Sequence, residues 1–77
     1  MQVDIRLFGA LRQHLPSEKR GRTSLTLPED ATVQQVIDQL TIHEFVIVAI
    51  NDEQAGDYTT PLHNGDTVLL FEAAAGG

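Results

Sequence analysis

Hydrophobic and polar residues alternate strictly over residues 2–7, with the apolar positions on one face of an extended chain. A period of two is typical of a strand with one buried face. A shorter alternation over residues 24–27 predicts a second strand. The polar segment between them, residues 17–22, contains Gly21 and is expected to be an exposed loop. The two strands are therefore predicted to form a hairpin. Between the first strand and this loop, Leu11 and Leu15 are four residues apart and predict one or two helical turns.

The period changes after residue 31. Apolar residues recur at a spacing of three and four, which is typical of one face of an amphipathic helix; they are Val33, Val36, Ile37 and Leu40. Thr32, followed three residues later by Gln35, fits a capping box at the start of that helix. This is the principal helix that the sequence predicts.

Two further apolar runs predict strands. Residues 45–50 form a continuous β-branched run, which favours a strand covered on both sides. The turn signal Asn64-Gly65-Asp66 precedes residues 67–71, a last strand that is hydrophobic on both faces and is expected in the centre of the sheet. The fold class is α+β, with a mixed sheet of four or five strands and one principal helix. A last strand parallel to the first gives the β-grasp (ubiquitin-like) arrangement.

Charge is distributed unevenly along the chain. The formal net charge is −6, yet all five basic residues lie in the first 22 positions. An acidic protein repels phosphate backbones, which argues against nucleic acid as a partner. The long acidic stretch from residue 23 onward favours a basic protein partner, although acidity also serves solubility alone.

Cysteine is absent, so any sulfur that this protein handles is not carried on its own side chains. No apolar run approaches the roughly 18 residues that span a bilayer. The N-terminal residues begin a strand pattern and do not resemble a signal peptide. We therefore expect a cytoplasmic protein that does not contact a membrane.

Residues 72–77 read Glu-Ala-Ala-Ala-Gly-Gly and lack large side chains after Glu72. Such a segment has nothing to bury, so we expect a β-grasp domain over residues 1–71 and a flexible tail over residues 72–77. Glycine has no Cβ and can enter a channel too narrow for other residues. Two terminal glycines arise by chance in roughly one chain in 200, so their position after a buried last strand carries more weight than their identity.

Several segments together resemble the family of ubiquitin-like sulfur carriers, which includes the small subunit of molybdopterin synthase and the thiamine-pathway carrier. The segments are residues 5–12, 31–33, 48–51 and 61–68, followed by Gly76-Gly77. The resemblance covers essentially the whole chain. The length and the sequence Phe8-Gly9-Ala10-Leu11-Arg12 favour the molybdopterin branch, whereas Glu72-Ala73-Ala74-Ala75 stands where that branch usually carries prolines.

The resemblance implies that a ubiquitin-activating-type adenylyltransferase uses ATP and magnesium to adenylate the Gly77 carboxylate. A sulfur donor enzyme then converts it to a thiocarboxylate, which is nucleophilic. In the molybdopterin branch, Ala75, Gly76 and Gly77 would enter the active site of the large synthase subunit. This chain would be a non-catalytic co-substrate that binds no cofactor. Phe71 and Glu72, at the base of the tail, are expected to contact the partner.

Alternatives stay open at this point. The sulfur acceptor could be a pterin, a thiazole or a tRNA base, and the same tail would serve a ubiquitin-like modifier conjugated to lysines. A plain β-grasp interaction module with an inert tail is the third reading. The histidines lack metal-ligand spacing, so no metal site is expected. The three phenylalanines are expected mainly in the core; they are Phe8, Phe45 and Phe71.

Overall fold

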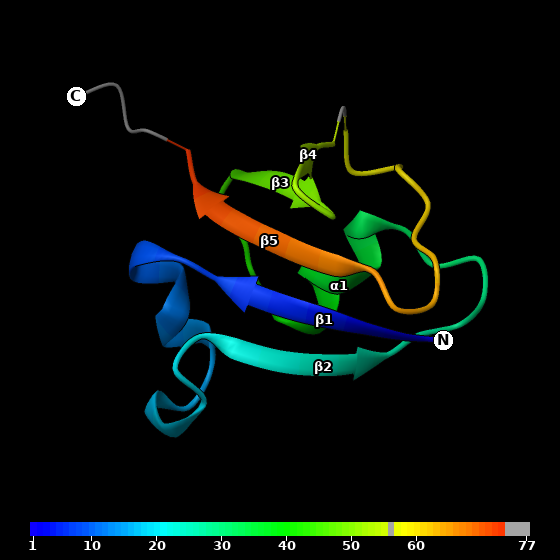
Figure 1. The fold of residues 1–77 in the computed structure, drawn as a ribbon. Coiled ribbons are helices and arrows are strands. Elements are labelled where there is room, and N and C mark those ends of the chain that lie inside the picture. Colours follow the sequence, from blue (N-terminus) through cyan, green and yellow to red (C-terminus); the bar gives the residue numbers. More distant parts are fainter. Residues whose placement is uncertain (56, 74–77) are drawn as a thin grey trace.

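The computed structural model describes residues 1–55 and 57–73, which form a five-stranded mixed sheet with one α-helix on one face (Figure 1). The strands are β1 (Gln2–Leu7), β2 (Arg22–Thr26), β3 (Val46–Ile50), β4 (Glu53–Gln54) and β5 (Thr67–Glu72). The helix is α1 (Val33–Gln39), and two short 3₁₀ helices, η1 (Gly9–His14) and η2 (Ser17–Lys19), connect β1 to β2. The α+β prediction and the β-grasp prediction are confirmed.

The strand order is β2-β1-β5-β3-β4, so the last strand is central, as predicted. β5 runs parallel to β1 and antiparallel to β3. The predicted hairpin of β1 and β2 is present, with Ile5 opposite Thr23. Because β1 and β5 are parallel, both end at the same edge of the molecule (Figure 1).

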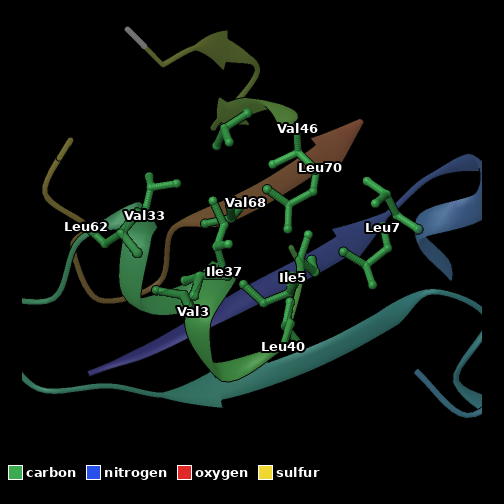
Figure 2. Packing of buried hydrophobic residues seen from close by; sticks show 14 of the residues in the cluster. Val3, Ile5, Leu7, Val33, Ile37, Leu40, Val46, Leu62, Val68 and Leu70 are labelled. Atoms are coloured by element: carbon green, nitrogen blue, oxygen red, sulfur yellow. The ribbon is translucent and has the colours of Figure 1, made fainter. Parts of the chain in front are cut away.

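The core lies between α1 and one face of the sheet (Figure 2). The alternating residues of β1 and β5 point into it, and the helix contributes the apolar positions predicted from its period. Burying each of these side chains stabilises the fold by about 1.5–3 kcal/mol. The central members are Val3, Ile5, Leu7, Val33, Val36, Ile37, Val68 and Leu70.

The start of α1 matches its sequence signature. The side-chain oxygen of Gln35 accepts a hydrogen bond from the Thr32 N–H at 2.9 Å, as part of a capping box. Gly65, in the predicted turn before β5, has φ of +89°, a value that glycine adopts without steric cost.

Two expectations were wrong. Phe8 is 40% exposed and Phe45 is 70% exposed, so these rings are not core residues. β3 buries Val46 and Val48, but its other face is only half-buried because α1 lies on the opposite side. The segment after β3 contains a short edge strand, β4, which is the fifth strand of the sheet and whose position the sequence did not indicate. Two residues of a strand with few apolar side chains carry almost no periodic signal.

Candidate functional site

The predicted reactive residues Ala75, Gly76 and Gly77 lie outside the described residues, so the site is described at its base. The base of the tail is the C-terminal end of β5, which includes Glu72 as its last residue. β5 and β1 end side by side, and the Phe8 N–H donates to the Leu70 carbonyl oxygen at 3.1 Å. The segment that follows β1 therefore lies against the last residues of β5.

Phe71 and Phe8 stack on the face of the sheet opposite α1. Their ring centroids are 4.7 Å apart and the rings are inclined by only 9°. Phe71 alternates with Leu70, which points into the core, so strand geometry places Phe71 on the open face. An aromatic pair of this kind presents a large apolar area at low cost in conformational entropy, which suits a contact with a partner.

The aromatic pair continues into an apolar strip along the open face. Ile47 lies opposite Phe71 and Ala49 lies opposite Leu69 in the β3–β5 register. All four residues are half-buried. This apolar sheet face leads to the base of the tail. The contact of Phe71 with a partner stays a prediction.

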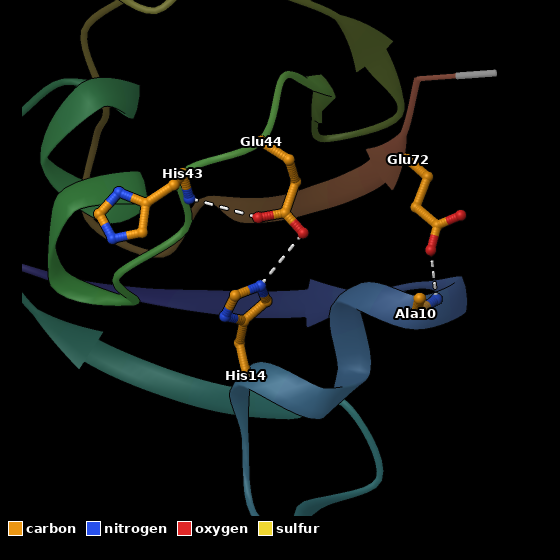
Figure 3. Close-up of polar contacts among 5 residues, drawn as sticks. All are labelled: Ala10, His14, His43, Glu44 and Glu72. Atoms are coloured by element: carbon orange, nitrogen blue, oxygen red, sulfur yellow. Dashed lines mark hydrogen bonds and ion pairs between the residues drawn. The ribbon is translucent and has the colours of Figure 1, made fainter. Parts of the chain in front are cut away.

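Glu72, the last residue of β5, contacts the segment that follows β1. Its carboxylate accepts a hydrogen bond from the Ala10 N–H at the start of η1 (Figure 3). The carboxylate carbon also lies 3.3 Å from the position that a Cβ on Gly9 would occupy. Gly9 has φ of +61°, so both the turn and the close approach favour glycine there. Glu72 thus contacts its own chain, and this contact ties the end of β5 to the start of η1.

Two carboxylates have shifted pKa values. Hydrogen bonds from its own backbone N–H and from His14 lower the pKa of Glu44, and the His14 Nε2 lies 3.3 Å from a Glu44 carboxylate oxygen (Figure 3). Hydrogen bonds from the Thr59 hydroxyl and backbone N–H lower the pKa of Asp57. The Asp57 carboxylate caps a local turn, whereas the Glu44 carboxylate connects the segment before β3 to His14 of η1.

Within the part of the chain that the structure describes, no cluster of histidine and acidic residues could hold a metal ion. The same residues contain no helix long and apolar enough to cross a membrane. The buried carboxylate of Asp66 accepts hydrogen bonds from the His63 N–H and the Asn51 amide, so it organises the turn before β5. The described residues form a scaffold with an apolar strip on the open face of the sheet.

Sequence reasoning identified Phe71 and Glu72 but assigned no role to Phe8, Gly9 and Ala10. The available signal was the position of Phe8 directly after an alternating strand, where the alternation places it on the open face. Its contact with Phe71 depends on the parallel register of β1 and β5, which local sequence does not contain.

A second aromatic contact lies at the edge of β3. Phe45 and Tyr58 have ring centroids 6.1 Å apart, and they line a shallow cavity of ≈ 300 Å³ together with Val46 and Ala55. The Tyr58 hydroxyl donates to the Val46 carbonyl oxygen at 2.8 Å and accepts from the Val46 N–H at 2.9 Å. Tyr58 thus supplies hydrogen-bond partners to the backbone of Val46, a part of the β3 edge that does not pair with β4.

Comparisons with known proteins agree with this geometry. The model of the ThiS family matches residues 5–77. No curated protein sequence matches the chain significantly.

Solved structures share the fold at low sequence identity. A putative molybdopterin converting factor subunit 1 from Pyrococcus furiosus is 21% identical, with a TM-score of 0.78 over 96% of this chain and 99% of that one. SAMP1 from Haloferax volcanii is 20% identical, with a TM-score of 0.77 over 100% of both chains. A chain in the complex of subunits 1 and 2 of molybdopterin-converting factor from Helicobacter pylori is 24% identical, with a TM-score of 0.65 over 100% of both chains. These likenesses show the fold.

Proposed function

Because the chain belongs to the ThiS family, we propose that it is a sulfur carrier whose C-terminal Gly77 receives and donates sulfur. One observation carries the proposal: the family match runs from β1 through Gly77, on a β-grasp fold whose central strand ends at a stacked aromatic pair on the open face of the sheet. The chain contains no cysteine, so the sulfur would be carried on the terminal carboxyl group.

The chemistry requires activation, because a carboxylate is a poor electrophile. An adenylyltransferase partner would join the Gly77 carboxylate to AMP from ATP and release pyrophosphate. A sulfur donor enzyme would then displace AMP and leave a thiocarboxylate. ATP and magnesium belong to the activating partner, and this chain presents the group that reacts.

We assign the carrier to molybdopterin synthesis, as the small subunit of a molybdopterin synthase-type complex. The support is the resemblance of residues 5–12 and 61–68 to that branch, together with fold similarity to two molybdopterin converting factor subunits. The Helicobacter pylori chain was solved with subunit 2, which favours a large-subunit partner here. Thiamine synthesis and tRNA thiolation are the alternative destinations of the sulfur.

Adenylation provides the first test. The purified chain and its activating enzyme should exchange labelled pyrophosphate into ATP, and deletion of Gly77 or addition of one serine after it should abolish the exchange. A chain with Glu29 replaced by glutamine, far from the tail in sequence, serves as the control and should exchange normally. Exchange that survives both changes to Gly77 would overturn the proposal.

A second candidate function is protein modification. Its support is the similarity in fold to SAMP1, also described as small archaeal modifier protein 1. The same activated Gly77 would form an isopeptide bond with a lysine of a target. Target lysines that carry an Ala-Ala-Ala-Gly-Gly remnant after digestion of lysate with a glutamate-specific protease, which cuts this chain after Glu72, would favour this function, and their absence alongside sulfur loading would exclude it.

A further inference from the structure

All four arginines of the chain line one hollow of ≈ 260 Å³ on the surface. The hollow lies between the end of β1, the start of β2 and the segment around η2. Its wall also includes the backbone of Phe8, Gly9 and Gly21. The arginines are Arg6, Arg12, Arg20 and Arg22.

Three separate parts of the structure bring these side chains together. Arg6 and Arg22 lie directly opposite each other in the β1–β2 register. Arg20 directly follows η2 and lines the hollow from there, with its backbone in the left-handed region (φ of +55°). The side chain of Arg12 lies against Gly21, because a Cβ there would be 3.0 Å from its Cγ and 3.2 Å from its Nε. Gly21, with φ of +75°, therefore leaves space for the Arg12 guanidinium beside the other three.

No carboxylate among residues 1–55 and 57–73 forms an ion pair with these arginines. The ion pairs in that part of the chain involve His14 and His63. Asp4, the acidic residue nearest along β1, accepts a hydrogen bond from the Ser24 hydroxyl at 3.0 Å instead. Like charges directly opposite each other on neighbouring strands destabilise a sheet. The cluster is thus an unneutralised positive site in a protein with a net charge of −6.

The hollow is adjacent to the base of the tail. Phe8 and Gly9 line it, while Phe8 also stacks on Phe71 and Gly9 contacts Glu72. β1 and β5 end at the same edge of the molecule (Figure 1). A partner that takes the tail therefore approaches the arginines as well.

We propose that the arginine hollow receives an acidic surface segment of the adenylyltransferase that takes the tail, an inference that rests on the proposed function. Guanidinium groups bind carboxylates through paired hydrogen bonds, which fix orientation as well as register. The uneven charge then orients the encounter. The arginine hollow faces the acidic segment of the partner, and that segment repels the acidic remainder of this chain. This arrangement orients the carrier with its tail toward the active site.

The kinetic test uses purified adenylyltransferase with the full chain. The double variant Arg12→Gln/Arg20→Gln should raise the KM for the carrier by about tenfold and leave kcat within about twofold, because docking and not chemistry is weakened. The wild-type KM should rise with salt, and the variant should show a flatter dependence. Lys19→Gln removes one charge outside the hollow and should change the KM by less than about twofold. A double variant with wild-type KM and salt dependence would overturn the inference while leaving sulfur loading intact.

A binding experiment separates this inference from the proposed function. In a titration of the wild-type chain with a hexaglutamate peptide followed by amide NMR, the Gly9 and Gly21 signals should shift, and the double variant with an otherwise unchanged spectrum should not respond. This outcome supports the acidic-partner surface even if adenylation of Gly77 fails. Saturable binding of inorganic pyrophosphate at these amides without any response to hexaglutamate would overturn the proposal in favour of a small-anion site.

Discussion

Glu72 makes two contacts with the segment after β1. Its carboxylate accepts a hydrogen bond from the Ala10 N–H, and the same carboxylate lies against Gly9. A hydrogen bond to a charged acceptor stabilises more than a neutral one. Both contacts hold the end of β5 against η1. They make Glu72 a structural residue at the base of the tail, beside its expected role in partner contact.

We predict that Glu72→Ala lowers the free energy of unfolding by about 1 kcal/mol, because the Ala10 N–H loses its acceptor. Glu72→Gln retains an oxygen acceptor and should cost less. Urea denaturation measures both, and hydrogen exchange of the Ala10 amide should accelerate most in the alanine variant. Equal stability of all three proteins would show that this hydrogen bond contributes nothing.

Glu44 gives a pH dependence with a definite sign. Hydrogen bonds from its own backbone N–H and from His14 favour the ionised carboxylate and lower its pKa below the ordinary 4.5. The folded state therefore binds the proton less readily than the unfolded chain. This contribution to stability is present above pH 4.5 and is lost as the pH falls through the folded pKa.

Comparison of wild type with Glu44→Gln measures that contribution. The stability difference between the two proteins should shrink as the pH is lowered from 6 toward 3. The chemical shifts of the His14 ring, compared between the two proteins by NMR, serve as the check on the contact. A stability difference that is constant over this range would contradict the assigned hydrogen bonds.

At the level of elements, the edge of β3 depends on a side chain from a loop. β4 pairs only with Ala49 and Ile50, and the Tyr58 hydroxyl satisfies both backbone groups of buried Val46. A free strand edge with unpaired backbone groups promotes association with other strands. Tyr58 thus protects an edge that the short β4 leaves open.

We predict that Tyr58→Phe lowers the free energy of unfolding by about 1–3 kcal/mol, because it leaves the N–H and carbonyl of Val46 without their partner. The ring and its contact with Phe45 are retained, so the loss reports the hydroxyl. Phe45→Leu, a change at a largely exposed ring, is the matched control and should cost less. Thermal unfolding and size-exclusion chromatography test both, and an unchanged Tyr58→Phe protein would contradict this role.

The elements with a strong period could be predicted from sequence. Alternation defined β1, and a spacing of three and four defined α1, because each pattern reflects one buried face. β4 could not be predicted, since it is held by the backbone of β3 and by the Val48 carbonyl, which accepts from the Ala55 N–H. Phe45 was placed wrongly because its apolar neighbours suggested a buried run, whereas it precedes the strand.

At the scale of the whole molecule, the site depends on contacts between distant parts of the chain. Phe8 meets Phe71, and Ala10 meets Glu72, only because β1 and β5 are parallel and in register. The sequence singled out Phe71 and Glu72 on β5 but gave no signal for their contacts with Phe8 and Ala10. The grouping of the arginines likewise arises from β1–β2 pairing, although their concentration in the first 22 positions was visible in the sequence.

Sulfur loading at Gly77 is tested most directly by the intact mass of the full chain purified after co-expression with its adenylyltransferase and sulfur donor. We predict a species heavier by the difference between one sulfur and one oxygen, with the change located on the C-terminal peptide that contains Gly77. The same change should be absent from the chain that lacks Gly77. A C-terminal peptide that carries only an ordinary carboxylate, although ATP–pyrophosphate exchange occurs, would contradict the sulfur-carrier function.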